Sequence, residues 1–389
     1  MEIHDAAVLS DWLARGRPLT GLRLQDLDLT PVAAALVGAT AATDVTGLVI
    51  LGGTVPPALA DHLRARGVMI FPADPDAPVD VFRAHLYTGA ELYAGLDGPQ
   101  GYAGTPDARA YRWSRDARLA HDAYATLLRA VHDDSISDAL DEWVSGRQVV
   151  GVMGGHVADR GSEEYAVAAR LGRELASAGL LVATGGGPGA MEAANLGALA
   201  PSESALADAL GRLGSVRSFR PDVGDWVRMA FAVLDSFTAV GGAQAEPRPG
   251  IRGPQERPGL LDPAPQPRSL GIPTWFYGHE PPNVFANGIA KYFSNAIRED
   301  GLIARCRAGV VVLPGAAGTL QEVFQLVARL YYAAPDAHLP PLVLVGREQW
   351  TQTLPVAGLL TKLGVGRPMA SAVHVVDGVE EAVAVIRAG

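Results

Sequence analysis

The sequence predicts an α/β protein, with a Rossmann-like, doubly wound parallel sheet and an additional, smaller N-terminal α/β domain. The length of 389 residues suggests two domains. A composition of 48% hydrophobic and 19% charged residues is ordinary for a globular protein with a buried core. In the second part of the chain, short continuous apolar runs alternate with amphipathic helical patterns. This alternation is typical of a parallel sheet that helices cover on both faces.

The N-terminal domain is predicted to span residues 1–145, and the sequence does not indicate its function. An apolar run ending in Gly52-Gly53 is followed by a helical pattern and a second apolar run, which together predict a βαβ-like unit over residues 46–71. No longer glycine fingerprint accompanies the glycine pair, so a plain strand-to-helix turn is favoured over a nucleotide loop. Residues 107–144 carry apolar residues at helical spacing, and the pattern changes after them, where we place the domain boundary.

The C-terminal domain is predicted to span residues 146–389, with an insertion at about residues 241–270 that is rich in proline and glycine. The insertion has too little apolar surface to offset its ordering entropy, so we expect a mobile or extended loop there. The predicted strands cover residues 148–153, 180–183, 274–277, 310–313 and 342–345, and a terminal strand and helix cover residues 373–387. The predicted helices cover residues 162–178, 225–237, 283–298 and about 319–330.

Composition and charge argue against several classes of function. The formal net charge of −10 disfavours a nucleic-acid partner, because binding to a phosphate backbone needs a basic face. The single cysteine, Cys306, rules out an intramolecular disulfide, and the nine scattered histidines show no metal-ligand spacing, so we expect no metal. Neither Lys291 nor Lys362 has the context of a Schiff-base lysine. The N-terminus lacks a signal-peptide core and no apolar run approaches a membrane span, so we expect a cytoplasmic protein without a membrane partner.

Three glycine loops follow predicted strands of the C-terminal domain, at residues 154–155, 185–189 and 315–319. A strand that leads through a glycine loop to a helix N-terminus gathers backbone N–H groups and a partial positive charge, which favours a phosphate. None of the loops has the dinucleotide fingerprint or a Walker lysine. The segment from Thr319 to Glu322 also fits the capping-box pattern, so a purely structural role for these two residues stays open.

Two of these loops together carry a resemblance. The segment TGGGPGAMEAANLGA at residues 184–198, paired with PGAAGTLQE at residues 314–322, resembles the LONELY GUY (LOG) family, formerly mislabelled as lysine decarboxylases. The resemblance covers residues 147–389, the insertion excepted. It implies a phosphoribohydrolase that cleaves the N-glycosidic bond of a nucleoside 5′-monophosphate to give free base and ribose 5-phosphate. It further implies no cofactor and a homodimer or higher homo-oligomer.

The resemblance also implies the catalytic residues. Glu322 falls on the motif glutamate, which would stabilise an oxocarbenium-like state or activate water. Arg298 lies nearest to the place of the family's catalytic arginine and would orient phosphate or carboxylate, with Arg305 as the alternative. Ala316 replaces a motif glycine, and Gly155-His156 stands where smaller members of the family have small hydroxyl residues.

The residues assigned to substrate binding share the three glycine loops. For Glu192, an acid that simply favours a first helical turn is as good an interpretation as a ribose contact. A non-catalytic nucleotide-binding sensor or carrier of the same fold remains the alternative function. The assigned residues are Gly155, Gly186, Gly187, Gly189, Met191, Glu192, Gly315, Gly318 and Thr319.

Overall fold

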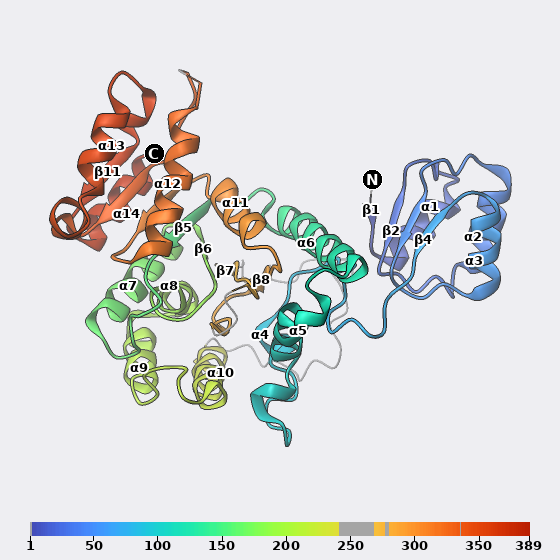
Figure 1. The fold of residues 1–389 in the computed structure, drawn as a ribbon, viewed down its shortest axis with the longest axis horizontal. Coiled ribbons are helices and arrows are strands. Elements are labelled where there is room, and N and C mark those ends of the chain that lie inside the picture. Colours follow the sequence, from blue (N-terminus) through green and yellow to red (C-terminus); the bar gives the residue numbers. More distant parts are fainter. Residues whose placement is uncertain (1, 241–267, 277–279, 335) are drawn as a thin grey trace. The chain divides into compact units, whose positions relative to one another are not determined.

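The computed structural model describes residues 2–240, 268–276, 280–334 and 336–389, which form two compact units (Figure 1). The first unit comprises residues 2–86 and Arg115–Glu142. The second unit comprises Tyr87–Ser114 and the described residues from Trp143 to the end of the chain. The segment Tyr87–Ser114 therefore packs within the second unit, although it precedes the predicted boundary near residue 145.

The first unit contains a four-stranded parallel sheet in the order β1-β2-β3-β4. Its core is rich in leucine, and Leu9, Leu24 and Leu36 are fully buried. The predicted βαβ unit is confirmed as β3, α3 and β4. The elements are β1 (Glu2–Ile3), α1 (Ala6–Ala14), β2 (Arg23–Gln25), α2 (Ala33–Ala42), β3 (Val49–Leu51), α3 (Pro57–Ala65), β4 (Met69–Phe71), η2 (Ala117–Leu119) and most of α6 (Ala123–Val144).

The glycine pair after β3 serves close packing. Gly52 and Gly53 both have positive φ, and a side chain at Gly53 would collide with the backbone of Leu27. A side chain at Gly52 would meet the ring of Phe82. These contacts agree with the interpretation of the pair as a plain strand-to-helix turn.

The second unit is built on a seven-stranded parallel sheet in the order β11-β10-β9-β5-β6-β7-β8, flanked by helices (Figure 1). The central strands are runs of apolar, mostly β-branched residues and are buried along their whole length, as a sheet covered on both faces requires. The α/β class with parallel sheets is thus confirmed. The strands are β5 (Val149–Met153), β6 (Leu181–Thr184), β7 (Ser269–Gly271), β8 (Gly288–Ile289), β9 (Gly309–Val312), β10 (Leu342–Val345) and β11 (Val373–Val376).

The helices of the second unit begin in the segment before the predicted boundary and continue to the last residues of the chain. The ends of α7, α10 and α14 lie within two or three residues of the predicted ends. The helices are α4 (Gly89–Leu92), η1 (Gly101–Gly104), α5 (Pro106–Arg115), α7 (Glu163–Ser177), α8 (Ala190–Leu199), α9 (Glu203–Leu213), α10 (Val223–Val240), α11 (Asn295–Arg305), α12 (Ala317–Tyr331), η3 (Gln349–Thr353), α13 (Val356–Gly364), η4 (Pro368–Ser371) and α14 (Val379–Ala388).

The region around residues 269–298 differs from the prediction. The strand lies at Ser269–Gly271 rather than at 274–277, where Thr274 makes only an isolated bridge to Tyr292. The predicted helix over 283–298 is wrong, because its first part forms strand β8 and pairs with β7, and the helix begins only at Asn295. The side chain of Ser294 caps that helix by accepting a hydrogen bond from the Ile297 N–H at 3.4 Å. Most of the insertion predicted at about residues 241–270 lies outside the described residues, and its last two residues, Ser269 and Leu270, belong to strand β7.

The segment Tyr87–Ser114 is joined to the second unit by a buried polar cluster around Asp107. Lys291 Nζ lies 2.6 Å from one carboxylate oxygen of Asp107, and the indole N–H of Trp275 donates to the same oxygen at 2.8 Å. The hydroxyl of Tyr102 donates to the other oxygen at 2.8 Å. Lys291 therefore pairs with a buried carboxylate. It does not lie in a helix, although it falls within the helix predicted over residues 283–298.

No helix in the described parts of the chain is long and apolar enough to cross a membrane. Among the same residues, no group of three or more histidine, cysteine, aspartate or glutamate side chains is arranged to hold a metal ion.

Candidate active site

The topology of the seven-stranded sheet marks one position at its carboxyl edge. From the central strand β5, the chain adds β6, β7 and β8 on one side and then returns to add β9, β10 and β11 on the other. The strand order therefore reverses between β5 and β9, which pair in parallel. In open α/β sheets, ligands bind beyond the carboxyl ends of the strands at such a switch point. The loops that leave β5 and β9 are the first and third of the predicted glycine loops.

The loop after β9 opens directly into α12. This helix begins at Ala317 with Ala316 as its N-cap residue, and no side chain caps it. Its first backbone bond runs from the Leu320 N–H to the Ala316 carbonyl at 3.0 Å, so the N–H groups of residues 317–319 have no carbonyl partner within the helix. Residues 316–318 are exposed, and no acidic residue lies in the first turn. This helix end is suited to an anion.

The predicted capping box at this helix is not formed. Thr319 is the third helical residue rather than the N-cap, because the helix begins two residues earlier than predicted. The Thr319 side chain is buried and packs against Gly315, where an added Cβ would collide with it. Gly315 is thus needed so that the loop can lie close to the first turn of α12.

The loop after β6 is tightly packed against the residues that surround it. Gly186 and Gly189 have φ of +72° and +74°, and Cβ atoms there would lie within 2.7 Å of Pro273 and of the backbone at residues 155–156. The backbone N–H of Asn283 donates to the Gly186 carbonyl at 2.8 Å, and its side-chain amide donates to the Gly187 carbonyl at 3.1 Å. The loop is therefore held from two sides.

Asn283 lies at the start of the predicted helix over residues 283–298, but in the structure it contacts the glycine loop. Its amide also donates to Asn195 Oδ1 at 3.0 Å, and that oxygen accepts a second bond from Thr184 Oγ1 at 2.7 Å. Asn195 lies in the motif at residues 184–198, inside helix α8, where most of the other residues are apolar. A lone asparagine in such a helix was the sequence signal for this network, because a buried amide needs partners.

Arg298 and Glu322 meet between these two loops. Arg298 Nη1 lies 3.4 Å from Glu322 Oε1, while its Nε donates to the Ile272 carbonyl at 2.8 Å and its Nη2 to the Gly185 carbonyl at 3.5 Å. Arg305, the alternative arginine, donates instead to the Gly301 carbonyl of its own helix at 2.9 Å. Of the two arginines, Arg298 is the one that contacts the motif glutamate.

The environment of Glu322 raises the pKa of its carboxyl above the usual 4.5. Burial is the largest cause, and the nearby carboxylate of Glu299 acts in the same direction. The positive charge of Arg298 opposes both. A carboxyl group with a raised pKa next to an arginine is typical of a functional site, although a structural ion pair has the same signature.

The other predicted binding residues divide into two groups. Met191 packs its thioether over Gly185 and Gly187, and the Gly155 N–H donates to the Pro314 carbonyl at 3.3 Å, so these residues shape the loops. Glu192 is only 1% exposed and forms a two-pronged ion pair with the equally buried Arg160. Its carboxylate is thereby occupied, which favours the structural interpretation of Glu192 over the ribose contact.

Sequence reasoning missed Glu280, which comes after the insertion. Its Oε2 lies 3.6 Å from the position that a Cβ on Gly187 would take, and its Oε1 lies 3.5 Å from His156 Nδ1. Glu280 therefore faces the loops that follow β5 and β6. Residues 277–279, directly before Glu280, lie outside the described residues.

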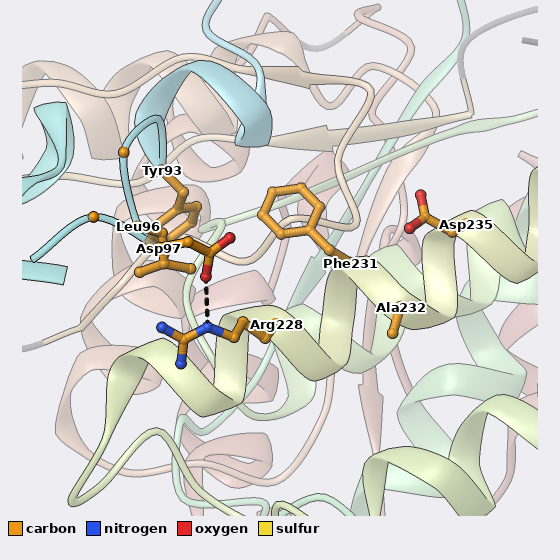
Figure 2. A pocket seen from close by; sticks show the side chains of 9 residues that line it. Tyr93, Leu96, Asp97, Arg228, Phe231, Ala232 and Asp235 are labelled. Carbon is orange, nitrogen blue, oxygen red and sulfur yellow. Dashed lines mark hydrogen bonds and ion pairs between the residues drawn. The ribbon is translucent and has the colours of Figure 1, made fainter. Parts of the chain in front are cut away.

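A separate open hollow of about 500 Å³ lies beside helix α10 (Figure 2). Arg228 Nε donates there to Asp97 Oδ1 at 2.8 Å, and the rings of Phe231 and Tyr93 meet edge to face with centroids 6.4 Å apart. None of the predicted site residues lines this hollow. It therefore adds nothing to the candidate active site.

Comparisons with known proteins agree with part of this picture. Residues 147–204, which include β5, β6 and the second glycine loop, match the sequence model described as the SLOG cluster4 family. Over these residues the chain is similar to the SLOG superfamily, which includes LOG-like proteins and contains both enzymes and ligand-binding proteins. No curated protein matches the chain.

One similar solved structure is that of the molybdenum cofactor binding protein from the phototrophic bacterium Rippkaea orientalis. The two chains are 16% identical with a TM-score of 0.34, and the alignment covers 63% of this chain and 98% of that chain. A likeness at this level bears on neither substrate nor activity.

Proposed function

We propose that this protein hydrolyses the N-glycosidic bond of a nucleoside 5′-monophosphate, releasing free base and ribose 5-phosphate. The observation that carries the proposal is the 3.4 Å contact between Arg298 and Glu322, next to the uncapped N-terminus of α12. The paired glycine motifs support the same chemistry through their resemblance to phosphoribohydrolases. The superfamily match supports a small-molecule ligand in more general terms.

In the proposed site, the 5′-phosphate binds the N–H groups at the start of α12. Residues 317–319 offer three such groups without an intrahelical partner, and the helix dipole adds a partial positive charge. No side-chain cap and no acid in the first turn compete with the ligand there. A phosphate at this helix end would lie one helical turn from Glu322.

Glu322 then acts on the glycosidic bond. Cleavage builds positive charge on the ribose ring, so a carboxylate stabilises the oxocarbenium-like transition state and can take a proton from the attacking water. Burial brings the pKa of Glu322 closer to neutrality, where a general base works best. Arg298 orients the carboxylate and is itself fixed by backbone carbonyls at Ile272 and Gly185.

A non-catalytic nucleotide sensor or carrier is the second candidate. Ala316 stands in place of a motif glycine, and its side chain is exposed in the proposed phosphate loop. The superfamily contains ligand-binding proteins as well as enzymes. A protein of this kind would bind the same nucleotides without releasing the base.

The test is incubation of the full-length protein with AMP, GMP, CMP, UMP and cytokinin riboside monophosphates, followed by measurement of free base and ribose 5-phosphate. We expect base release by the wild type and a loss of at least about 100-fold in Glu322→Gln. The matched control is Glu203→Gln, which alters an exposed first-turn glutamate of α9 and should leave the rate unchanged. Tight nucleotide binding by the wild type without base release would overturn the hydrolase and support the sensor or carrier.

The resemblance also leads us to propose a homodimer or higher homo-oligomer. Sedimentation equilibrium of the purified protein tests this directly. A monomer at micromolar concentration would contradict it.

A further inference from the structure

The two uncapped helix ends at the candidate site differ in charge. The first turn of α12 has no acidic residue, whereas the carboxylate of Glu280 faces the glycine loop that precedes α8. A phosphate dianion is therefore repelled less at α12. This assigns the phosphate to α12 and leaves the loop after β6 to an uncharged part of the ligand.

Glu280 is the acidic group that borders this second position. Its side chain is 22% exposed, and its Oε1 lies 3.5 Å from Nδ1 of His156, whose side chain is 53% exposed. The carboxylate lies over Gly187, which has no side chain to fill the space between them. Glu280 thus faces loops that follow two adjacent strands, β5 and β6.

The chemistry of Glu280 differs from that of the other two glutamates. Glu322 is paired with Arg298, and Glu192 is held by Arg160 through both oxygens. An ionised carboxylate only accepts hydrogen bonds, and its two oxygens can accept from two neighbouring hydroxyl groups. Of the uncharged parts of a nucleotide, the 2′,3′-diol of ribose is the one that presents two adjacent hydroxyl donors, and an acidic side chain is a common ribose acceptor in nucleotide sites.

We infer that Glu280 accepts hydrogen bonds from the ribose hydroxyls, with His156 holding its carboxylate, and that it makes the site selective for ribonucleotides over 2′-deoxyribonucleotides. The inference deepens the proposed function and rests on it for the identity of the ligand. A carboxylate built to receive a hydroxyl loses a charge-assisted hydrogen bond when that hydroxyl is missing.

The experiment measures binding and turnover separately. Calorimetry on full-length Glu322→Gln gives the affinities for AMP and dAMP without turnover, and the same titrations are repeated after adding Glu280→Ala. We expect AMP to bind about tenfold more tightly than dAMP, and we expect Glu280→Ala to bring the ratio close to one by weakening AMP more than dAMP, which keeps its 3′-hydroxyl. The exposed Glu203→Gln should leave the ratio unchanged. If Glu280→Ala does not fold, Glu280→Gln replaces it and should give an intermediate ratio.

The outcomes separate the two proposals. Equal affinity for AMP and dAMP, no binding of AMP, or a ratio that survives the change at Glu280 would overturn the role of Glu280. Wild-type protein that discriminates between AMP and dAMP through Glu280 but releases no base would support that role and contradict only the hydrolase. Where base release occurs, the kcat/KM values for AMP and dAMP should show the same Glu280-dependent ratio.

Discussion

The glycine loops at residues 185–189 and 314–318 are alike in sequence but differ in the structure. Each follows a buried strand and opens a helix that has no side-chain cap. The first loop is buried, and side chains at its glycines would collide with the surrounding chain. The second is exposed, and a side chain at Gly318 would meet nothing within 4 Å.

This difference separates two uses of glycine. At Gly189 the missing side chain allows the close approach of another loop, with a backbone conformation that L residues rarely adopt. At Gly318 the missing side chain leaves the helix N–H groups open to a ligand. Arg298 connects the two loops, because its guanidinium reaches the Gly185 carbonyl and the Glu322 carboxylate.

Removing this connection should have the largest effect. Arg298→Ala leaves a mostly buried Glu322 without its cation, so we expect activity to fall by at least about 100-fold and the free energy of unfolding to fall by about 3 kcal/mol. Base release and urea unfolding measure the two effects. The matched control is Arg305→Ala, whose arginine donates within its own helix and whose loss should leave activity close to wild type. Equal losses in both variants would contradict the assignment of Arg298.

The next prediction contrasts the two kinds of glycine. Gly189→Ala places a Cβ 2.7 Å from the carbonyl oxygens of Gly155 and His156 at a positive φ, which should lower the free energy of unfolding by about 2–3 kcal/mol. Gly318→Ala, in open space, should change it by less than about 0.5 kcal/mol. Urea unfolding of both variants tests this contrast. Similar changes in the free energy of unfolding at the two positions would contradict the proposed difference between the two loops.

A charge at the open loop should separate stability from binding. Gly318→Asp adds a carboxylate at the N-terminus of α12, so we expect it to stabilise the fold by about 0.5 kcal/mol. The same carboxylate repels the phosphate, and AMP should bind about tenfold more weakly, which corresponds to about 1.4 kcal/mol. Gly318→Asn is the neutral control. If both variants weaken AMP equally, the phosphate does not bind at this helix end.

The smallest effect concerns pH. Because the folded-state pKa of Glu322 lies above its unfolded value near 4.5, the folded protein binds the extra proton, and stability is lost as the pH rises from 4.5 through the folded-state pKa. Glu322→Gln removes this dependence, so the variant should gain stability relative to the wild type over that range. Chemical unfolding at several pH values measures the gain. In the wild type, the acidic limb of the rate profile should lie above pH 4.5, since the ionised form acts.

The sequence predicted the central sheet well because its strands are continuous apolar runs. Strand β10 has the predicted bounds, β5 begins one residue later than predicted, and β9 is shifted by one residue at both ends. Signals that lie within one short segment were sufficient for these strands. Arg298 and Glu322 do lie 3.4 Å apart, although Arg298 belongs to neither glycine motif, and their catalytic roles stay a prediction.

Such local signals did not predict contacts between distant segments. The amide of Asn283 bonds Gly187, which lies 96 residues earlier, and nothing local to either residue indicates this. A helical pattern over residues 283–298 was overridden because its first part adds a strand to the sheet. The capping-box pattern at Thr319 was misleading for a similar reason, since the helix begins at Ala317 where no side-chain signal exists.

The buried cluster at Asp107 has a consequence for the order of folding. Its partner Lys291 lies 184 residues later in the chain. At roughly 5–20 residues per second, ribosomal synthesis reaches Lys291 roughly 10–40 s after Asp107 has been made. The segment Tyr87–Ser114 therefore cannot pack against its partners in the second unit until they have been synthesised. Asp107 stays hydrated until most of the nascent chain has emerged. We expect the second unit to acquire its full protection from hydrogen exchange only late in synthesis, when the lysine arrives.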